Sequence, residues 1–194
     1  MSTLEVNKIT PSTGTTITLG DSGDTFTIPS GVTLTNNGTV TGIGGVNTPA
    51  FEAYLASSQS ISDSVATKVQ FGTERFDTAN CYDNSSNYRF TPTTAGKYFV
   101  YANVQLRMSG YDIYVAKTLI YKNGSEYGAT NTASNTNTIL AHPVTISAII
   151  DMNGSSDYVE IFGFIAGHGG GGNSFDAGTK NCYFGAYRII EWAY

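Results

Sequence analysis

The chain has 194 residues, enough for one ordinary domain and an appendage, and its formal net charge is −5. Its ten Lys and Arg residues are scattered singly, which excludes the basic patch on which nucleic-acid binding depends. No apolar run reaches the length of about 18 residues that a membrane span needs, so we expect no membrane insertion. The N-terminus lacks a basic segment followed by an apolar one, so we expect no secretory signal and synthesis in a cytoplasm.

Residues 1–47 are rich in Thr, Gly and Asn, and Phe26 is the only aromatic residue among them. Short stretches that alternate apolar and polar residues, such as TTITLG and VTLTNNG, recur along this region. A single copy has too few apolar side chains to bury a core, whereas several intertwined copies could pool them. We therefore predict a β-rich stalk shared between chains. The alternative is a disordered linker, which the regular alternation and the low charge disfavour. The apolar residues available for pooling are Leu4, Val6, Ile9, Ile17, Leu19, Phe26, Ile28, Val32, Leu34 and Val40.

After a junction rich in Gly, aromatic residues become frequent and the apolar stretches lengthen. Runs such as GKYFVYANVQLRM and PVTISAIIDM are typical of strands, and no stretch shows a convincing helical period. Asn-Gly pairs at 123–124 and 153–154 lie between such runs and predict hairpins, because the favoured two-residue turns need positive φ. We predict an all-β domain over residues 48–194, an antiparallel sandwich of about eight to ten strands.

Several predicted strands are apolar on both faces. The run at 97–108 has a core face, and its opposite face begins with Phe99 and Tyr101. The runs at 158–165 and 183–192 also alternate apolar or aromatic residues on both faces. Because the outer face of an antiparallel sandwich is normally wet, these aromatic residues need a further partner. Another copy of the chain, related by rotational symmetry, is the simplest partner, and tolerated surface aromatics are the alternative. The predicted core face of the first run consists of Tyr98, Val100, Ala102, Val104, Leu106 and Met108.

Cys81 and Cys182 are the only cysteines, too few for a disulfide framework, and they have no CxxC spacing. We expect two reduced and buried thiols. A single disulfide between them is the alternative.

The stretch YRFTPTTAGKYFVYANVQL, residues 88–106, resembles the signature of the C1q-like domain in the tumour necrosis factor-like jelly-roll superfamily. Phe90, Gly96 and Tyr98 match its motif, a Phe followed after five residues by Gly-x-Tyr. The sequence departs from the motif at Val100 and Ala102, where the family usually has aromatic residues. The resemblance covers roughly residues 50–194. It implies an antiparallel jelly roll that packs as a compact homotrimer.

The opening MSTLEVNKITPSTGTTITLG resembles the attachment and shaft region of bacteriophage fibre proteins. The two resemblances together imply a structural virion protein, a short trimeric fibre assembled in the bacterial host cytoplasm. Residues 1–47 would attach to another virion protein, and a head over residues 48–194 would contact a glycan or protein of the host surface. The alternatives are a head fibre, decoration or collar protein without receptor binding, and a carbohydrate-binding, lectin-like trimer.

The sequence shows no catalytic signature. No HExxH, GxSxG or phosphate-loop pattern occurs, and the acidic residues are spread over turns, so we expect no enzyme. The run DNSSN at 83–87 alternates oxygen-bearing side chains as calcium loops do, but it lacks the following Gly and the distant Glu. We expect a surface turn there. Calcium is implied only by the family resemblance, and no cofactor or metal ligand is predicted.

A glycine-rich stretch, IAGHGGGGNSFDAG at 165–178, lies between the last two predicted strands. A phosphate loop would lead into a helix, and no helix follows here, so we interpret the stretch as a long connection. We expect it at the exposed end of a trimer, where loops suit a sugar or protein surface. The candidate receptor-contact residues are His168, Asn173 and Asp176, with Tyr111 from the turn at 108–112.

Overall fold

The computed structural model describes residues 9–35, 37, 47–110, 112–134, 140–167, 172–178 and 180–189. The chain divides into two units, Met1–Gly44 and Gly45–Tyr194, close to the boundary that the composition suggests. Residues 9–35 of the first unit form turns and extended chain without strands, and Leu19 and Phe26 are 62% and 68% exposed. An intertwined β-stalk requires several copies of the chain, so it stays a prediction.

The second unit contains only strands and turns within its described residues, which confirms the predicted all-β sandwich. Thirteen strands in the described residues form two antiparallel sheets around one core. Five of the strands have only two or three residues, which is why they outnumber the expectation. In the described part of the chain no helix is long and apolar enough to cross a membrane.

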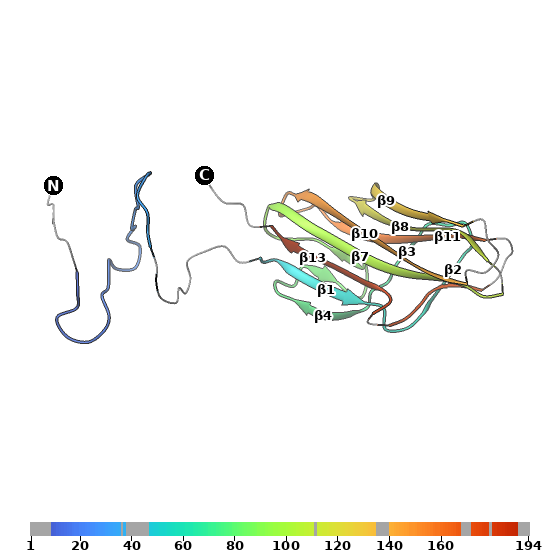
Figure 1. The fold of residues 1–194 in the computed structure, drawn as a ribbon, viewed down its shortest axis with the longest axis horizontal. Helices are drawn as coiled ribbons and strands as arrows, with labels where there is room; N and C mark the ends of the chain where they lie inside the picture. The colour runs from blue at the N-terminus through green and yellow to red at the C-terminus, as the bar shows by residue number, and fades with distance from the viewer. Residues whose placement is uncertain are drawn as a thin grey trace. The chain divides into compact units, whose positions relative to one another are not determined.

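The first sheet is built around β7, its longest strand. β10 pairs along one edge of β7, while β12 and β13 share the other edge end to end. Figure 1 shows β10, β7, β13, β1 and β4 side by side. The strands of this sheet are β2 (Gln59–Ile61), β12 (Asn173–Phe175), β7 (Gly96–Met108), β13 (Tyr183–Arg188), β1 (Ala50–Tyr54), β4 (Thr73–Asp77) and β10 (Ala141–Met152).

The second sheet covers the opposite side of the core in the order β5-β6-β11-β8-β9, with β3 paired to β11. Its strands are β5 (Tyr82–Asp83), β6 (Arg89–Phe90), β11 (Val159–Gly167), β8 (Ile113–Lys122), β9 (Ser125–Ala133) and β3 (Thr67–Lys68). β8 and β9 form a hairpin through Asn123 and Gly124, whose φ angles of 53° and 78° are those of the predicted turn.

The Asn153–Gly154 pair does not make a hairpin, contrary to the prediction. β10 pairs with β7 in the first sheet, while β11 pairs with β8 in the second, so this turn carries the chain from one sheet to the other. Gly154 has a φ of 72°, and Oδ1 of Asn153 accepts the backbone N–H groups of residues 155–157. The local turn chemistry is as expected, but the partner strands are different.

The core is formed by alternating inward side chains of both sheets. All six residues of the predicted core face of β7 are at most 1% exposed. Phe51 of β1 stacks on Phe90 and Tyr82 with ring centroids 4.6 and 4.5 Å apart, and it meets Phe184 edge-on at 4.8 Å. Aromatic pairs in these geometries contribute beyond the area they bury. Both cysteines are free thiols and buried, as expected.

Candidate functional site

Apolar side chains gather on the outer face of the first sheet. The register makes Ile149, Phe99 and Tyr187 direct neighbours across β10, β7 and β13. The rings of Phe99 and Tyr187 have centroids 5.5 Å apart, within the range of aromatic contact. Ile149 is 56% exposed and Tyr187 is 39% exposed. In the single chain, this row of apolar side chains is therefore open to solvent.

The neighbouring row centres on Tyr101, which lies opposite Gly185 of β13. A Cβ atom on Gly185 would lie 2.4 Å from the Tyr101 hydroxyl, so the ring occupies the space above the glycine. This position lets the Tyr101 hydroxyl donate to Oε2 of Glu52 at 2.6 Å, while Arg75 pairs with Oε1 of the same carboxylate. Burial, and then the bond to Glu52, raise the pKa of Tyr101, so its hydroxyl stays protonated as a donor.

These rows continue onto β1 and β4. Phe76 of β4 lies opposite Glu52 and is 47% exposed, and the Tyr101 and Tyr183 rings lie 6.3 Å apart. Contiguous apolar surfaces that stay exposed in a single chain are common where proteins bind other molecules. We call it the aromatic face, and its members are Tyr54, Phe76, Phe99, Tyr101, Ile149, Tyr183 and Tyr187.

The outer face of the second sheet is different. Phe162 packs against Tyr121 with centroids 4.2 Å apart, and Nζ of Lys68 lies 5.9 Å from the Phe162 ring. Nζ of Lys117 lies 5.1 Å from the ring of Phe164. Cations over aromatic faces are attracted by the ring quadrupole. The aromatic residues at 158–165 therefore have partners within their own chain, and their contact with another chain stays a prediction.

Two of the predicted receptor-contact residues, Asn173 and Asp176, are held by other side chains of the jelly roll. Asn173 lies in β12, is 4% exposed, and its Nδ2 is 3.4 Å from Oδ1 of Asp63. Asp176 accepts from Nε of Arg107 at 2.6 Å, and its side chain is 14% exposed. Because the long β7 leaves an edge that β13 does not reach, the segment around Asn173 pairs there and turns these side chains into the fold.

His168 and Tyr111 lie outside the described residues, so their display at the exposed end stays a prediction. The glycine-rich connection is not a simple link between the last two strands either, since β12 interrupts it. Its described part is attached to the first sheet through β7 and β2.

The carboxylate of Asp83, the first residue of the DNSSN run, accepts hydrogen bonds from the residues of its own turn. Its two oxygens accept the backbone N–H groups of Ser85, Ser86 and Asn87 and the side-chain amide of Asn87. These hydrogen bonds hold the pKa of Asp83 well below its usual range. The carboxylate therefore closes a surface turn, as the sequence suggested. In the described ranges, no group of three or more His, Cys, Asp or Glu residues could hold a metal ion.

No family model matches the sequence, and no curated protein matches it either. Among solved structures, Eiger TNF from S. frugiperda matches with a TM-score of 0.54 and 9% identity, over 74% of this chain and 94% of that one. The globular domain of zebrafish complement 1qA protein matches with a TM-score of 0.51 and 14% identity, over 74% and 99% of the two chains. Murine APRIL matches with a TM-score of 0.51 and 10% identity, over 72% and 99%.

The second unit is a jelly roll of the C1q/TNF-like type. The motif that carried the resemblance in the sequence has a structural role in this jelly roll. Phe90 of β6 and Tyr98 of β7 face each other across the two sheets with ring centroids 5.5 Å apart. Gly96 opens β7 at a φ of 145°, and a Cβ atom there would lie 3.0 Å from Nε of Arg188.

The sequence did not predict the hydrogen-bonded group of Glu52, Tyr101 and Arg75 on the aromatic face. Glu52 stands inside the apolar run AFEAY, and a charged residue in such a run signals a pairing partner. Gly185 interrupts CYFGAYR, and a glycine within a strand signals the close approach of another group. Both signals were present, but neither indicates which distant residue is the partner.

Proposed function

We propose that the chain forms a homotrimer through the aromatic face of its jelly roll and serves as a short bacteriophage fibre. In this proposal the C1q-like head contacts the host surface, and residues 1–47 attach the fibre to another virion protein. The aromatic face is the observation that carries the proposal. It spans β10, β7, β13, β1 and β4, and it leaves Phe76, Ile149 and Tyr187 open in the single chain.

Burial of this face would remove apolar area from water at roughly 25 cal/mol per Å². The Glu52–Arg75 ion pair beside Tyr101 is already internally satisfied, because Glu52 accepts from both Tyr101 and Arg75. Covering the face with another copy would therefore leave the Glu52 carboxylate paired. A homotrimer is also what the sequence resemblance to C1q-like domains implies, and closed rotational symmetry suits one repeated face.

Two features of the first unit support the fibre. Its opening residues resemble the attachment and shaft region of phage fibres. Its described apolar side chains, including Ile17, Leu19 and Phe26, are exposed when the chain is alone. Side chains of this kind are the ones that an intertwined stalk would bury. Three heads on one stalk would also strengthen weak contacts with a cell by multivalency.

Native mass measurement tests the assembly. We expect the 20.6 kDa chain to give a species of about 62 kDa, and the variant Ile149→Lys to give monomers. Ile149 points outward at 56% exposure, so the change should leave the monomer folded while placing a charge inside the proposed interface. Val65→Lys is the matched control, because Val65 is 50% exposed and lies outside the aromatic face.

The same variants test host contact by whole-cell binding across a panel of bacterial strains. Binding by the wild-type chain and by Val65→Lys, with loss in Ile149→Lys, is the result that multivalent contact predicts. A folded wild-type monomer would overturn the assembly. A trimer that binds no strain would instead favour the decoration, collar or head-fibre role.

A further inference from the structure

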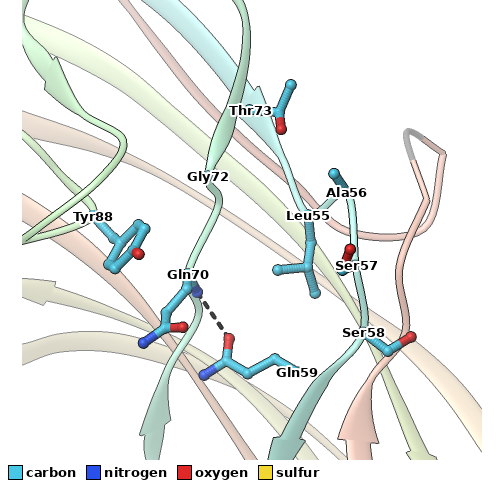
Figure 2. A pocket seen from close by; sticks show the side chains of 9 residues that line it. All are labelled: Leu55, Ala56, Ser57, Ser58, Gln59, Gln70, Gly72, Thr73 and Tyr88. Carbon is cyan, nitrogen blue, oxygen red and sulfur yellow. Dashed lines mark hydrogen bonds between the residues drawn. The ribbon is translucent and has the colours of Figure 1, made fainter.

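A hollow of about 330 Å³ lies on the side of the jelly roll, between the segment after β1 and the segment that leads into β4. Figure 2 shows Gly72 between the Tyr88 side chain and residues 55–58. The volume is within the range of about 300–1,000 Å³ that small-molecule sites occupy. The lining shares no residue with the aromatic face.

Gly72 leaves this space open. Val69 and Phe71 are fully buried, so alternation along the extended chain turns Gln70 and Gly72 outward. A Cβ atom on Gly72 would find Asn84 O at 3.7 Å as its nearest neighbour, which is an ordinary contact distance. Neither packing nor a positive φ therefore requires glycine at this position. Gly72 lines the hollow and adds no side chain to it.

The walls of the hollow are held by the fold. Nε2 of Gln59 donates to the carbonyl of Lys68 at 2.9 Å, and Oε1 of Gln59 accepts the backbone N–H of Gln70 at 2.9 Å. Figure 2 shows the second of these bonds joining the two sides. On the other wall, Oγ of Ser58 accepts the backbone N–H of Ala177 at 3.0 Å. The hollow is thus preformed, which lowers the entropic cost of filling it.

Four of the side chains that line this space have polar groups without a hydrogen bond in the described part of the chain. The side chains of Ser57, Gln70, Thr73 and Tyr88 make no hydrogen bond to any described residue. Hydroxyl and primary amide groups can each both donate and accept. The Tyr88 ring and the buried Leu55 add apolar surface beside them. The lining therefore suits a ligand that carries hydroxyls around an apolar frame.

No charged side chain lines the hollow, so an anionic or cationic ligand would lose its hydration without a counter-charge. We propose that this hollow binds one neutral sugar residue of a polysaccharide. The inference rests on the proposed contact with the host surface, and it names the ligand class and the side chains that hold the ligand. Each site would bind a single sugar with a Kd on the order of millimolar, and a trimer would strengthen the contact by engaging three sites at once.

Saturation-transfer NMR on the full chain tests this with glucose, galactose, mannose, rhamnose and N-acetylglucosamine, each at about 20 mM. At least one sugar should receive saturation, with a Kd on the order of 1–10 mM. Gly72→Val should fill the hollow and weaken binding at least about tenfold. Gln70→Ala should weaken it several-fold while keeping the backbone N–H that bonds to Gln59. Gly128→Val is the matched control and should bind like the wild-type chain, because a side chain on Gly128 in β9 meets open space.

The proposal is overturned if none of the five sugars receives saturation, or if Gly72→Val binds as the wild-type chain does. Equal binding of glucuronate or inorganic phosphate at this site would also overturn it, because the lining offers no counter-charge.

Conversion of the Gly72→Val trimer to monomers would show instead that another copy fills the hollow. Cell binding that survives in Gly72→Val would refute this site and leave the proposed host contact standing. Sugar binding at this site without any cell binding would refute the proposed host contact and leave the sugar site standing.

Discussion

At the scale of single residues, burial decides the chemistry of Cys182. The side chain is fully buried, and this burial raises its pKa to about 12, although the backbone N–H of Gln105 points at the sulfur from 3.2 Å. In the unfolded chain a thiol ionises near pH 8.5. In the folded state the thiol therefore stays protonated to higher pH than in the unfolded chain. As the pH rises from about 9 to 12, this difference lowers the free energy of unfolding. At neutral pH the thiol is inert.

We expect iodoacetamide at pH 8 to leave both cysteines of the folded protein unmodified over hours and to modify both in about 8 M urea, because Cys81 is also buried. Mass spectrometry after timed quenching measures this difference. Replacement of Cys182 by Ala should in addition flatten the loss of stability above pH 9. Alkylation of native Cys182 at the rate of a free thiol would contradict the burial.

At the scale of elements, the link between β10 and β11 shows how one turn can join two sheets. Asn123 in the β8–β9 hairpin accepts the backbone N–H of Tyr158 at 2.9 Å, and its Nδ2 donates to Asp157 at 2.8 Å. The hairpin and the crossover turn are thus tied together at this end of the domain. Gly154 passes so close to the chain at 94–95 that a Cβ atom would lie 2.2 Å from the backbone nitrogen of Ala95.

Gly154→Ala should therefore lower the free energy of unfolding by at least about 2 kcal/mol, because it adds a backbone overlap to an unfavourable positive φ. Gly128→Ala, on the open surface of β9, should change it by less than about 1 kcal/mol. Urea denaturation followed by Trp or Tyr fluorescence measures both. Equal midpoints for the two variants would show that the crossover turn can relax.

At the scale of the whole molecule, the described hydrophobic core belongs to the second unit. Among the described residues, the hydrophobic core runs from Phe51 to Ala186, and the chain divides near residue 45. The described residues of the first unit add none to this core. The two parts can therefore be separated in an experiment.

A chain lacking residues 1–47 should fold, unfold within a few °C of the full chain, and remain trimeric through the aromatic face. It should no longer attach to virions. Calorimetry, native mass measurement and electron microscopy of mixed particles report these three properties. A truncated head that still decorates particles would place the attachment site in the jelly roll instead.

The alternation of residues along β7, the Asn-Gly hairpin at 123–124 and the all-β class could be predicted from the sequence. Local rules control these features, since side chains in a strand alternate faces and a tight turn needs particular φ angles. Tertiary structure alone decided that the 153–154 turn changes sheets, that β12 buries Asn173, and that Lys117 covers Phe164. The hollow beside Gly72 also depends on tertiary structure, because three separate segments form it. Each of these depends on which distant segments become neighbours, and pairing between distant strands leaves no local pattern in the sequence.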